Sequence, residues 1–175
     1  MLCGGDRNLF LDHEISKPKE ISTYQSHQMI KGLLKDAQGL YRDYGSYLLV
    51  RTEEAITGAG NPLRQAPQDE VMGFELRACV SKKRKGKHIY FPTRDWRARH
   101  DWLHRQGIRN GFKVLTVNCH AEMQEIDDSR GRKFMVDQTD FVGVLKVEDP
   151  IHFEGALTKG VGSTATTYGF GMLII

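Results

Sequence analysis

The chain has 175 residues, of which 39% are hydrophobic and 27% charged, and its formal net charge is +3. A chain of this length can bury one sizeable core or two small ones, so we expect one or two compact domains. It has no apolar run of about 18 residues, and residues 1–6 show neither a basic start nor an apolar stretch, which argues against a membrane span and a secretion signal. We therefore expect a cytoplasmic protein.

Residues 1–70 predict an incomplete set of elements. A first strand is expected at residues 8–14. Ser22 is a suitable N-cap for a helix that runs to about residue 36, and apolar residues recur along it at helical spacing: Ile30, Leu33, Leu34 and Ala37. Gly39 suits the end of this helix. A second strand is expected at residues 46–51, followed by an irregular linker.

Residues 71–175 predict a fuller pattern. Strands are expected at residues 72–80, 112–119 and 141–147. A basic loop at 81–87 leads toward a helix at 94–106, for which Thr93 is the expected cap. Asp149 and Pro150 have the N-cap and N1 pattern of a short helix, which should end at Lys159-Gly160. A glycine-rich loop and a final strand follow.

This order is β-α-β-β-α-β, which predicts an α+β protein of the ferredoxin-like or RRM-like kind. The elements of the first 70 residues then look like a partial second copy of the same arrangement. We therefore divide the chain into a shortened N-terminal domain, residues 1–70, and a C-terminal domain, residues 71–175.

Positive charge is concentrated in one segment of the chain. Residues 82–109 contain ten Lys or Arg residues and two Asp residues, so this segment carries +8 and the rest of the chain −5. The ten are Lys82, Lys83, Arg84, Lys85, Lys87, Arg94, Arg97, Arg99, Arg105 and Arg109. A basic block on an otherwise acidic protein favours a polyanionic partner, and the alternative is a solvated loop and helix face.

The last sixteen residues contain two Gly-hydrophobic-Gly triplets, Gly160-Val161-Gly162 and Gly169-Phe170-Gly171, which bracket six small or hydroxylated residues, the last of them Tyr168. Glycine at four fixed places indicates positive φ or a close approach of the backbone. Such a loop can offer backbone N–H groups to phosphates, and the alternative is a turn before an edge strand. It is not the glycine motif of a nucleotide-binding fold, because only a short strand fits after it.

Other local motifs predict no separate chemistry. His100 and His104 share a helix face, but spacing offers no third metal ligand. His120-Ala121-Glu122 resembles half of a zinc deaminase signature, but no cysteine follows Cys119. The three cysteines are 40 or more residues apart and form neither a disulfide framework nor a zinc site. We expect no metal and no small-molecule cofactor.

Tyr24 and His27 are the candidate catalytic pair. Residues three apart share a helix face, so the phenol and the imidazole can converge on one atom above the buried stripe. Imidazole is the commonest acid or base at neutral pH. The alternative is a structural histidine, because His27 is in register with Ile30 and Leu34.

Several short motifs follow one another along residues 8–175: Tyr24-x-x-His27, Phe74-Glu75-Leu76-Arg77-Ala78, the basic loop, Asp101-Trp102-Leu103, Gly111-Phe112, Phe141-Val142-Gly143-Val144-Leu145, Asp149-Pro150 and the two glycine triplets. In this order they resemble the CasE subtype of CRISPR-associated repeat endoribonucleases. The resemblance implies two tandem RRM-like domains and metal-independent cleavage at the base of a CRISPR repeat hairpin. It also implies that the enzyme stays on the mature crRNA as a subunit of a surveillance complex.

The chain departs from this family in two places. Between Arg51 and Met72 there is too little chain for the strand-helix-strand that normally completes the first domain. The glycine loop is one residue longer than usual and lacks the basic residue often found inside it, for which Lys159 is a possible substitute.

The chemistry that we expect follows from RNA itself. A ribose 2′-hydroxyl lies beside its own phosphate, so an enzyme need only align it, remove its proton and stabilise the phosphorane. We assign His27 as general base, or alternatively as acid to the 5′-oxygen, and Tyr24 as the positioning or charge-stabilising hydroxyl. The expected products carry a 5′-hydroxyl and a 2′,3′-cyclic phosphate.

The expected RNA contacts come from the basic segment and the glycine loop: Lys82, Lys83, Arg84, Lys85, Lys87, Arg94, Arg97, Lys159, Gly160, Gly162, Ser163, Thr164, Gly169 and Gly171. Two other functions remain open at this point. One is a noncatalytic RNA-binding subunit that holds the 3′ handle of the crRNA, and the other is a basic-patch module that binds proteins.

Overall fold

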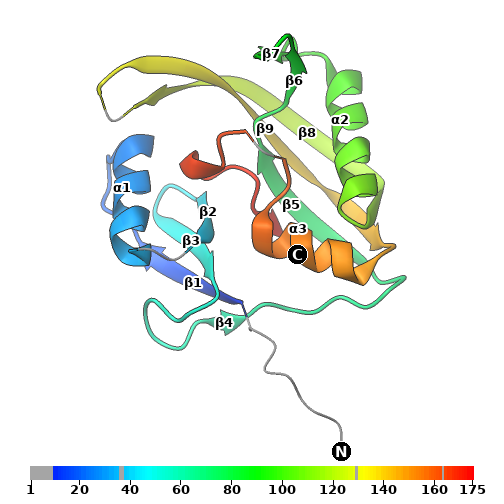
Figure 1. Cartoon of the computed structure of the whole chain (residues 1–175), viewed down its shortest axis with the longest axis horizontal. Coiled ribbons are helices and arrows are strands. Elements are labelled where there is room, and N and C mark those ends of the chain that lie inside the picture. Colours follow the sequence, from blue (N-terminus) through cyan, green and yellow to red (C-terminus); the bar gives the residue numbers. More distant parts are fainter. Residues whose placement is uncertain (1–9, 36–37, 129, 163) are drawn as a thin grey trace, which may run out of the picture.

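The computed structural model describes residues 10–35, 38–128, 130–162 and 164–175. Two four-stranded antiparallel sheets form its framework, and each has one helix or more packed on it (Figure 1). The first sheet is built from residues 11–62 and the second from residues 71–174. In the described residues, no helix is long and apolar enough to cross a membrane.

The first sheet has the strand order β2-β3-β1-β4. Its elements are β1 (Leu11–Ser16), α1 (Thr23–Leu34), β2 (Gly39–Asp43), β3 (Tyr47–Thr52) and β4 (Asn61–Pro62). This is the order of a ferredoxin-like sheet in which the second helix is missing, because residues 53–60 hold no helix and β4 has only two residues. Gly39 was expected to end the helix, but it begins β2, and the helix ends at the C-cap Lys35.

The second sheet has the order β10-β5-β9-β8, which is the complete ferredoxin-like arrangement. Its strands are β5 (Val71–Ala78), β8 (Phe112–Asp127), β9 (Lys133–Val147) and β10 (Leu173–Ile174). The helices α2 (Trp96–Arg109) and α3 (Pro150–Lys159) connect them in the expected places. The predicted fold class is therefore confirmed.

The basic loop is a small hairpin of its own. β6 (Ser81–Arg84) pairs with β7 (Lys87–Tyr90), and Lys85 and Gly86 form the tip, both with positive φ. Because β6 and β7 make a separate two-stranded sheet, the hairpin projects from the main body (Figure 1). We expected a loop at residues 81–87, and the structure shows that all of it except the two tip residues is paired as strand.

The long β8–β9 hairpin was not foreseen. Its two strands pair continuously from Phe112↔Val147 to Asp127↔Lys133, apart from one bulge at Val114/Thr116, whereas we expected strands only at 112–119 and 141–147. The outer half reads as polar because much of it is exposed on one face. In Figure 1 this outer half extends beside α1, so it joins the second sheet to the helix of the first.

Helix ends follow local side-chain chemistry. Ser22 caps α1 in a reciprocal capping box with Gln25, and Asp149 caps α3 with Pro150 in the first turn. The cap of α2 is Asp95, whose carboxylate accepts the Ala98 N–H, and not Thr93. Helix α2 therefore begins two residues later than predicted, directly after Asp95.

All four glycines of the triplets have positive φ, between 83° and 90°. The triplets also pair with each other, because the Val161 N–H donates to the Gly171 carbonyl at 2.7 Å, and a Cβ on Gly160 would lie 3.0 Å from that same oxygen. Val161 and Phe170, at the centres of the triplets, are buried. The expected need for glycine is confirmed, and its cause is the closing of a loop onto the core.

Arg51 of β3 joins the first sheet to both ends of this loop. Its guanidinium is buried, makes a two-pronged ion pair with Asp12 at 2.7 and 2.8 Å, and donates to the carbonyls of Leu157 and Leu173 at 2.9 and 2.8 Å. Leu157 lies near the end of α3, before the loop, and Leu173 begins β10, after it. One side chain thus holds the loop's two ends against the first sheet.

We predict that Arg51→Met lowers the free energy of unfolding by about 3–5 kcal/mol, because it leaves a partly buried carboxylate and two carbonyls without their donor. Arg64→Met is the matched control, since Arg64 pairs with Glu70 at the surface and its side chain is 60% exposed. Its loss should cost less than about 1 kcal/mol. Urea unfolding measures both, and equal values for the two variants would contradict the role given to Arg51.

Candidate nucleic-acid interface

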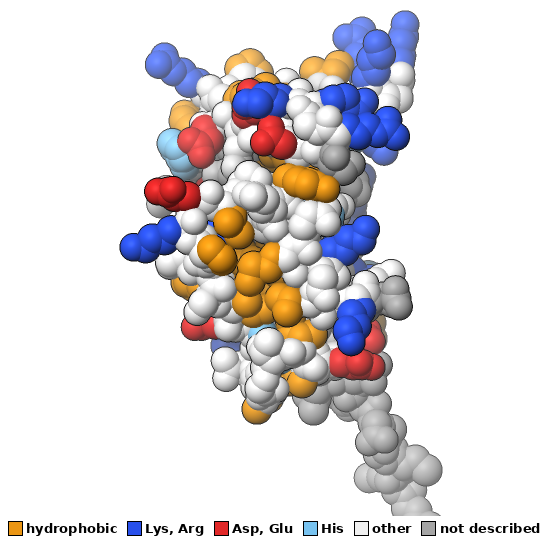
Figure 2. All heavy atoms as spheres, turned by 90° about the vertical axis from the view of Figure 1, so that its left-hand side faces the viewer, with side chains coloured by type: hydrophobic (Ala, Val, Ile, Leu, Met, Phe, Trp, Pro, Cys, Tyr) orange, Lys and Arg blue, Asp and Glu red, His pale blue; other side chains and the backbone are white. Residues whose placement is uncertain are grey.

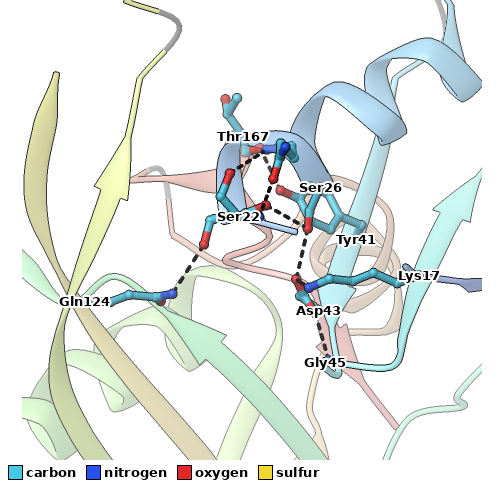
Figure 3. A network of polar contacts seen from close by, with 10 residues as sticks. Lys17, Ser22, Ser26, Tyr41, Asp43, Gly45, Gln124 and Thr167 are labelled. Carbon is cyan, nitrogen blue, oxygen red and sulfur yellow. Dashed lines mark hydrogen bonds and ion pairs between the residues drawn. The ribbon is translucent and has the colours of Figure 1, made fainter. Parts of the chain in front are cut away.

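Helix α1 is held in place by polar contacts from β2 and β8 (Figure 3). The Asp43 carboxylate of β2 accepts from Ser26 on the buried face of α1 at 3.3 Å and from Lys17 at 2.6 Å. Gln124 of β8 donates to Thr23 at 3.4 Å. The start of α1 is therefore fixed by both sheets, and with it the position of Tyr24 and His27.

His27 borders an open groove of about 550 Å³. The groove lies between α1, the start of β2 and the glycine loop, and Lys31, Lys159, Thr166 and Thr167 also line it. The Tyr41 hydroxyl donates to the Thr167 carbonyl at 3.1 Å and so fixes this part of the loop. The structure thus brings together His27 and Lys159, two of the residues that the sequence singled out.

The pKa of His27 is lowered from its usual value. Partial burial is the largest cause, the positive charge of Lys31 adds to it, and contact with the Thr167 carbonyl acts in the opposite direction. A lower pKa keeps the imidazole neutral near pH 7. Neutral imidazole can accept a proton, which is what a general base requires.

Tyr24 lies one turn before His27 on α1, but it does not line the groove. Its side chain is partly exposed. The convergence of the phenol and the imidazole on one atom therefore stays a prediction. Lys31 was missed, although its position four residues after His27 puts it on the same helix face, so the spacing that paired Tyr24 with His27 could also have found Lys31.

A second, basic groove of about 580 Å³ lies on the other side of the glycine loop. Lys82, Lys83 and His88 of the β6–β7 hairpin line it, together with Arg105 and Arg109 of α2. Gly160, Gly162 and Thr164 of the loop complete the wall. The structure thus gathers the basic hairpin and the glycine loop into one surface, as a shared ligand requires.

The remaining basic residues divide into exposed and buried ones. Arg84, Lys85 and Lys87 at the hairpin tip, and Arg94 and Arg97 near the start of α2, are exposed but do not line the groove. Their contact with RNA stays a prediction. Arg105 and Arg109 belong to the basic segment but were not chosen as contacts, because the sequence does not show that their helix faces the loop.

Arg99 does not contribute to the basic surface, although it is one of the ten basic residues of the segment. It is fully buried and pairs with Asp137 at 2.7 Å, while also donating to Thr139 at 3.0 Å. Carboxylate and guanidinium cancel each other inside the protein. The field of this segment is therefore weaker than its sequence charge of +8 indicates.

The glycine loop separates the two grooves. Gly160, Gly162 and Thr164 face the basic groove, while Lys159, Thr166 and Thr167 face the His27 groove. Gly169 and Gly171 are buried, and a Cβ on Gly169 would come within 2.9 Å of the Tyr41 ring. Their observed part is to shape the loop, so a contact with RNA stays a prediction. Ser163 lies outside the described residues.

The histidine and cysteine motifs set aside in the sequence can be compared with the part of the chain that the structure describes. In the described residues, no three His, Cys, Asp or Glu side chains gather as metal ligands. Cys79 is buried, and burial raises the pKa of its thiol to about 11. Neither His100 nor His104 lines either groove.

A family model described as "CRISPR associated protein" matches residues 11–175. Among solved structures, Cse3 of Thermus thermophilus bound to an RNA representing a pre-cleavage complex has a TM-score of 0.79 at 20% identity, covering 95% of this chain and 98% of that one. Cas6e of Escherichia coli K-12 has a TM-score of 0.69 at 20% identity, with 94% and 97% covered. A chain of a CRISPR RNA-guided surveillance complex has 0.70 at 19% identity, again with 94% and 97% covered. Comparison with curated proteins gives no match.

We predict that the pKa of His27, followed by NMR through its ring signals, lies below the ordinary value of about 6.5. Lys31→Met should raise it, because the variant removes a positive charge that disfavours imidazolium and leaves the ring partly buried. Lys113→Met, which removes an exposed charge at the start of β8, is the control and should leave it unchanged. If the pKa of His27 is the same in Lys31→Met as in wild type, Lys31 does not contribute to lowering it.

Proposed function

Because the chain belongs to the family of CRISPR-associated proteins, we propose that it is an endoribonuclease that binds the hairpin of a CRISPR repeat and cleaves precursor crRNA. One observation carries the proposal: a partly buried histidine with a lowered pKa lies across the glycine loop from a basic groove. RNA whose phosphates bind in the basic groove can pass over the loop to His27. The same chain would then hold and cut one ligand.

The basic groove suits a hairpin stem. Lys82, Lys83, Arg105 and Arg109 approach it from a hairpin and a helix, so their charges meet a phosphate backbone from two sides. A-form RNA hides base edges in its deep major groove but exposes its phosphates. Recognition by charge and shape is therefore the mode that this groove favours.

The proposed reaction uses the ribose 2′-hydroxyl as nucleophile and needs no metal. Neutral His27 takes the proton from this hydroxyl, and the oxygen attacks the adjacent phosphorus in line. The bond from phosphorus to the 5′-oxygen breaks, and the 5′-oxygen takes up a proton from water. Lys31 and Lys159, which border the same groove, stabilise the charge of the phosphorane. Tyr24 positions the phosphate. The products carry a 2′,3′-cyclic phosphate and a 5′-hydroxyl.

The proposal extends to partners and organisation. The similar structures include one bound to RNA and one within a surveillance complex, so we propose that this chain stays on the mature crRNA as a subunit of such a complex in the cytoplasm. We also propose residues 1–70 and 71–175 as its two domains. The strands of the first sheet all fall before this boundary and those of the second all after it.

A noncatalytic RNA-binding subunit is the second candidate. The observation that favours it is the packing of His27 against Tyr168, with ring centroids 5.8 Å apart, as a structural histidine would show. In that case the RNA would bind in the same basic groove but remain whole. Incubation of the protein with a repeat hairpin, followed by a denaturing gel, separates the two functions.

We predict that His27→Ala slows cleavage about 10²- to 10⁴-fold under single-turnover conditions, while the affinity for the hairpin stays nearly constant. Gln28→Ala, which changes an exposed neighbour on α1, is the control and should cut normally. If His27 is the base, the wild-type rate rises with pH through the pKa of His27 and then levels; an acid role reverses this slope. Normal cutting by His27→Ala would exclude it from the mechanism.

The substrate provides a second arm of the same experiment. A single deoxyribose 5′ of the scissile phosphate removes the nucleophile, so cutting should stop while binding persists. Cleavage of the ribose hairpin should also continue in EDTA. If the deoxy hairpin is cut, or if EDTA abolishes cutting and magnesium restores it, water or a metal must act in place of the proposed chemistry.

We predict that Arg105→Ala combined with Arg109→Ala weakens hairpin binding and flattens its salt dependence. Each lost phosphate contact removes roughly 0.7 to 0.9 from the slope of log K against log salt, so the double variant should lose about 1.4 to 1.8. Lys19→Ala with Lys113→Ala is the control, since it removes the same charge from exposed residues outside the groove. If the slope of log K against log salt is the same for the two double variants, Arg105 and Arg109 make no phosphate contacts.

A further inference from the structure

Three rings lie in a row beside the His27 groove. The His27 and Tyr168 rings are 5.8 Å apart and inclined at 54°, and the Tyr168 and Phe134 rings are 5.7 Å apart and inclined at 64°. They come from α1, the short helix η1 (Thr166–Tyr168) in the glycine loop and β9. The proposed reaction assigns a role to the first ring only.

Phe134 is the outermost and least covered of the three. Phe134 of β9 lies opposite Ile126 of β8. The next pair on the same face of this hairpin is Val136 opposite Gln124. Ile126 and Val136 are buried, whereas Phe134 remains 37% exposed. Phe134 therefore lies at the edge of this small core, with part of its ring at the protein surface.

The chain beside Phe134 offers cations next to an aromatic ring. Arg132 and Lys133, directly before Phe134, have exposed side chains, each paired with a carboxylate. Figure 2 shows hydrophobic side chains gathered in the middle of the face that carries α1, with Lys, Arg, Asp and Glu side chains around them. Tyr168 packs against both His27 and Phe134, whereas Phe134 keeps 37% of its surface exposed, so part of the Phe134 ring remains open to a ligand. Nucleobases stack on such rings, and their phosphates require the cations.

The chemistry of cleavage creates a base that needs such a surface. In-line attack requires the 2′-oxygen, the phosphorus and the leaving 5′-oxygen to be nearly collinear. In a regular stacked RNA strand these three atoms are not collinear. The two nucleotides beside the scissile phosphate must therefore turn apart, and a base that leaves the stack loses its neighbours. Splayed bases are held in RNA-binding proteins by aromatic side chains.

We propose that Phe134, supported by Tyr168, forms a stacking platform for the base immediately 3′ of the scissile phosphate. The inference rests on the proposed function, because it takes His27 as the place where the phosphate is cut. The ligand is an unpaired nucleobase of the RNA substrate. The platform touches the substrate and holds it in the geometry for attack, while proton transfer remains with His27.

The test uses a repeat hairpin whose cut site has been mapped from the ends of its products. One deoxyribose blocks cutting, and 2-aminopurine replaces the base 3′ of the scissile phosphate. Binding of the wild-type protein should quench the fluorescence of this base, as stacking on an aromatic ring does. Phe134→Trp should retain the quenching, whereas Phe134→Leu should lose it and bind about tenfold more weakly, as expected for one stacked base.

Two controls separate stacking from structure. Met135→Leu changes the neighbouring side chain, which points to the other face of β9 and is 46% exposed, and it should behave as wild type. Thermal melting of each variant shows whether Phe134→Leu stays folded, since leucine keeps the apolar contact with Tyr168. Undiminished quenching by a folded Phe134→Leu variant, or a rise in fluorescence when wild type binds, would overturn the platform.

The same samples distinguish this inference from the proposed function. The all-ribose hairpin is incubated with wild type in parallel, and its cleavage depends on His27 chemistry whatever the fluorescence shows. Cutting without quenching rejects the platform alone. Cutting by His27→Ala as fast as by wild type, with quenching that Phe134→Leu abolishes, rejects the proposed His27 chemistry and leaves an aromatic base-binding site.

Discussion

The buried guanidinium of Arg51 is the contact on which the arrangement of both grooves depends. It comes from the first sheet, yet its donors reach the carbonyls that precede and follow the glycine loop. Asp12, on the neighbouring strand β1, balances its charge. Since a buried ion is tolerated only when it is paired and fully bonded, the loop ends and the first sheet have little freedom to move apart.

The parts that approach the proposed RNA path come from distant segments of the chain. α1 carries His27, α3 ends with Lys159, and the β8–β9 hairpin reaches across to contact Thr23 and Tyr168. The first sheet lacks its second helix but keeps α1, whose position is fixed by Asp43 and Gln124. The shortened first sheet therefore still has the contacts that orient its candidate catalytic helix.

Local chemistry made some features predictable. The Ser22 N-cap, the Asp149-Pro150 start of α3 and the four glycines with positive φ each depend on residues close in sequence, and all are observed. Features that depend on distant partners were not predicted. Arg99 reads as a surface charge until Asp137, far along the chain, is seen beside it.

The candidate site divides in the same way. Helical spacing paired Tyr24 with His27 and could have found Lys31, because all three lie within two turns of α1. Arg105 and Arg109 could not be assigned to a groove from sequence, because their neighbours there are the β6–β7 hairpin and the glycine loop. The outer half of the β8–β9 hairpin was not predicted, because many of its residues are exposed and its sequence lacks the alternation of apolar and polar residues that marks a strand.

The pairing of β10 with β5 has a consequence for folding. Leu173 lies opposite Leu76, so the second sheet is completed by a contact between residues almost a hundred positions apart. Contacts of such long range form late, because the chain between them must first be ordered. The glycine loop lies just before β10 and is closed by the same event. Since residues of this loop line both grooves, neither groove is complete until the loop has been synthesised and β10 has paired with β5.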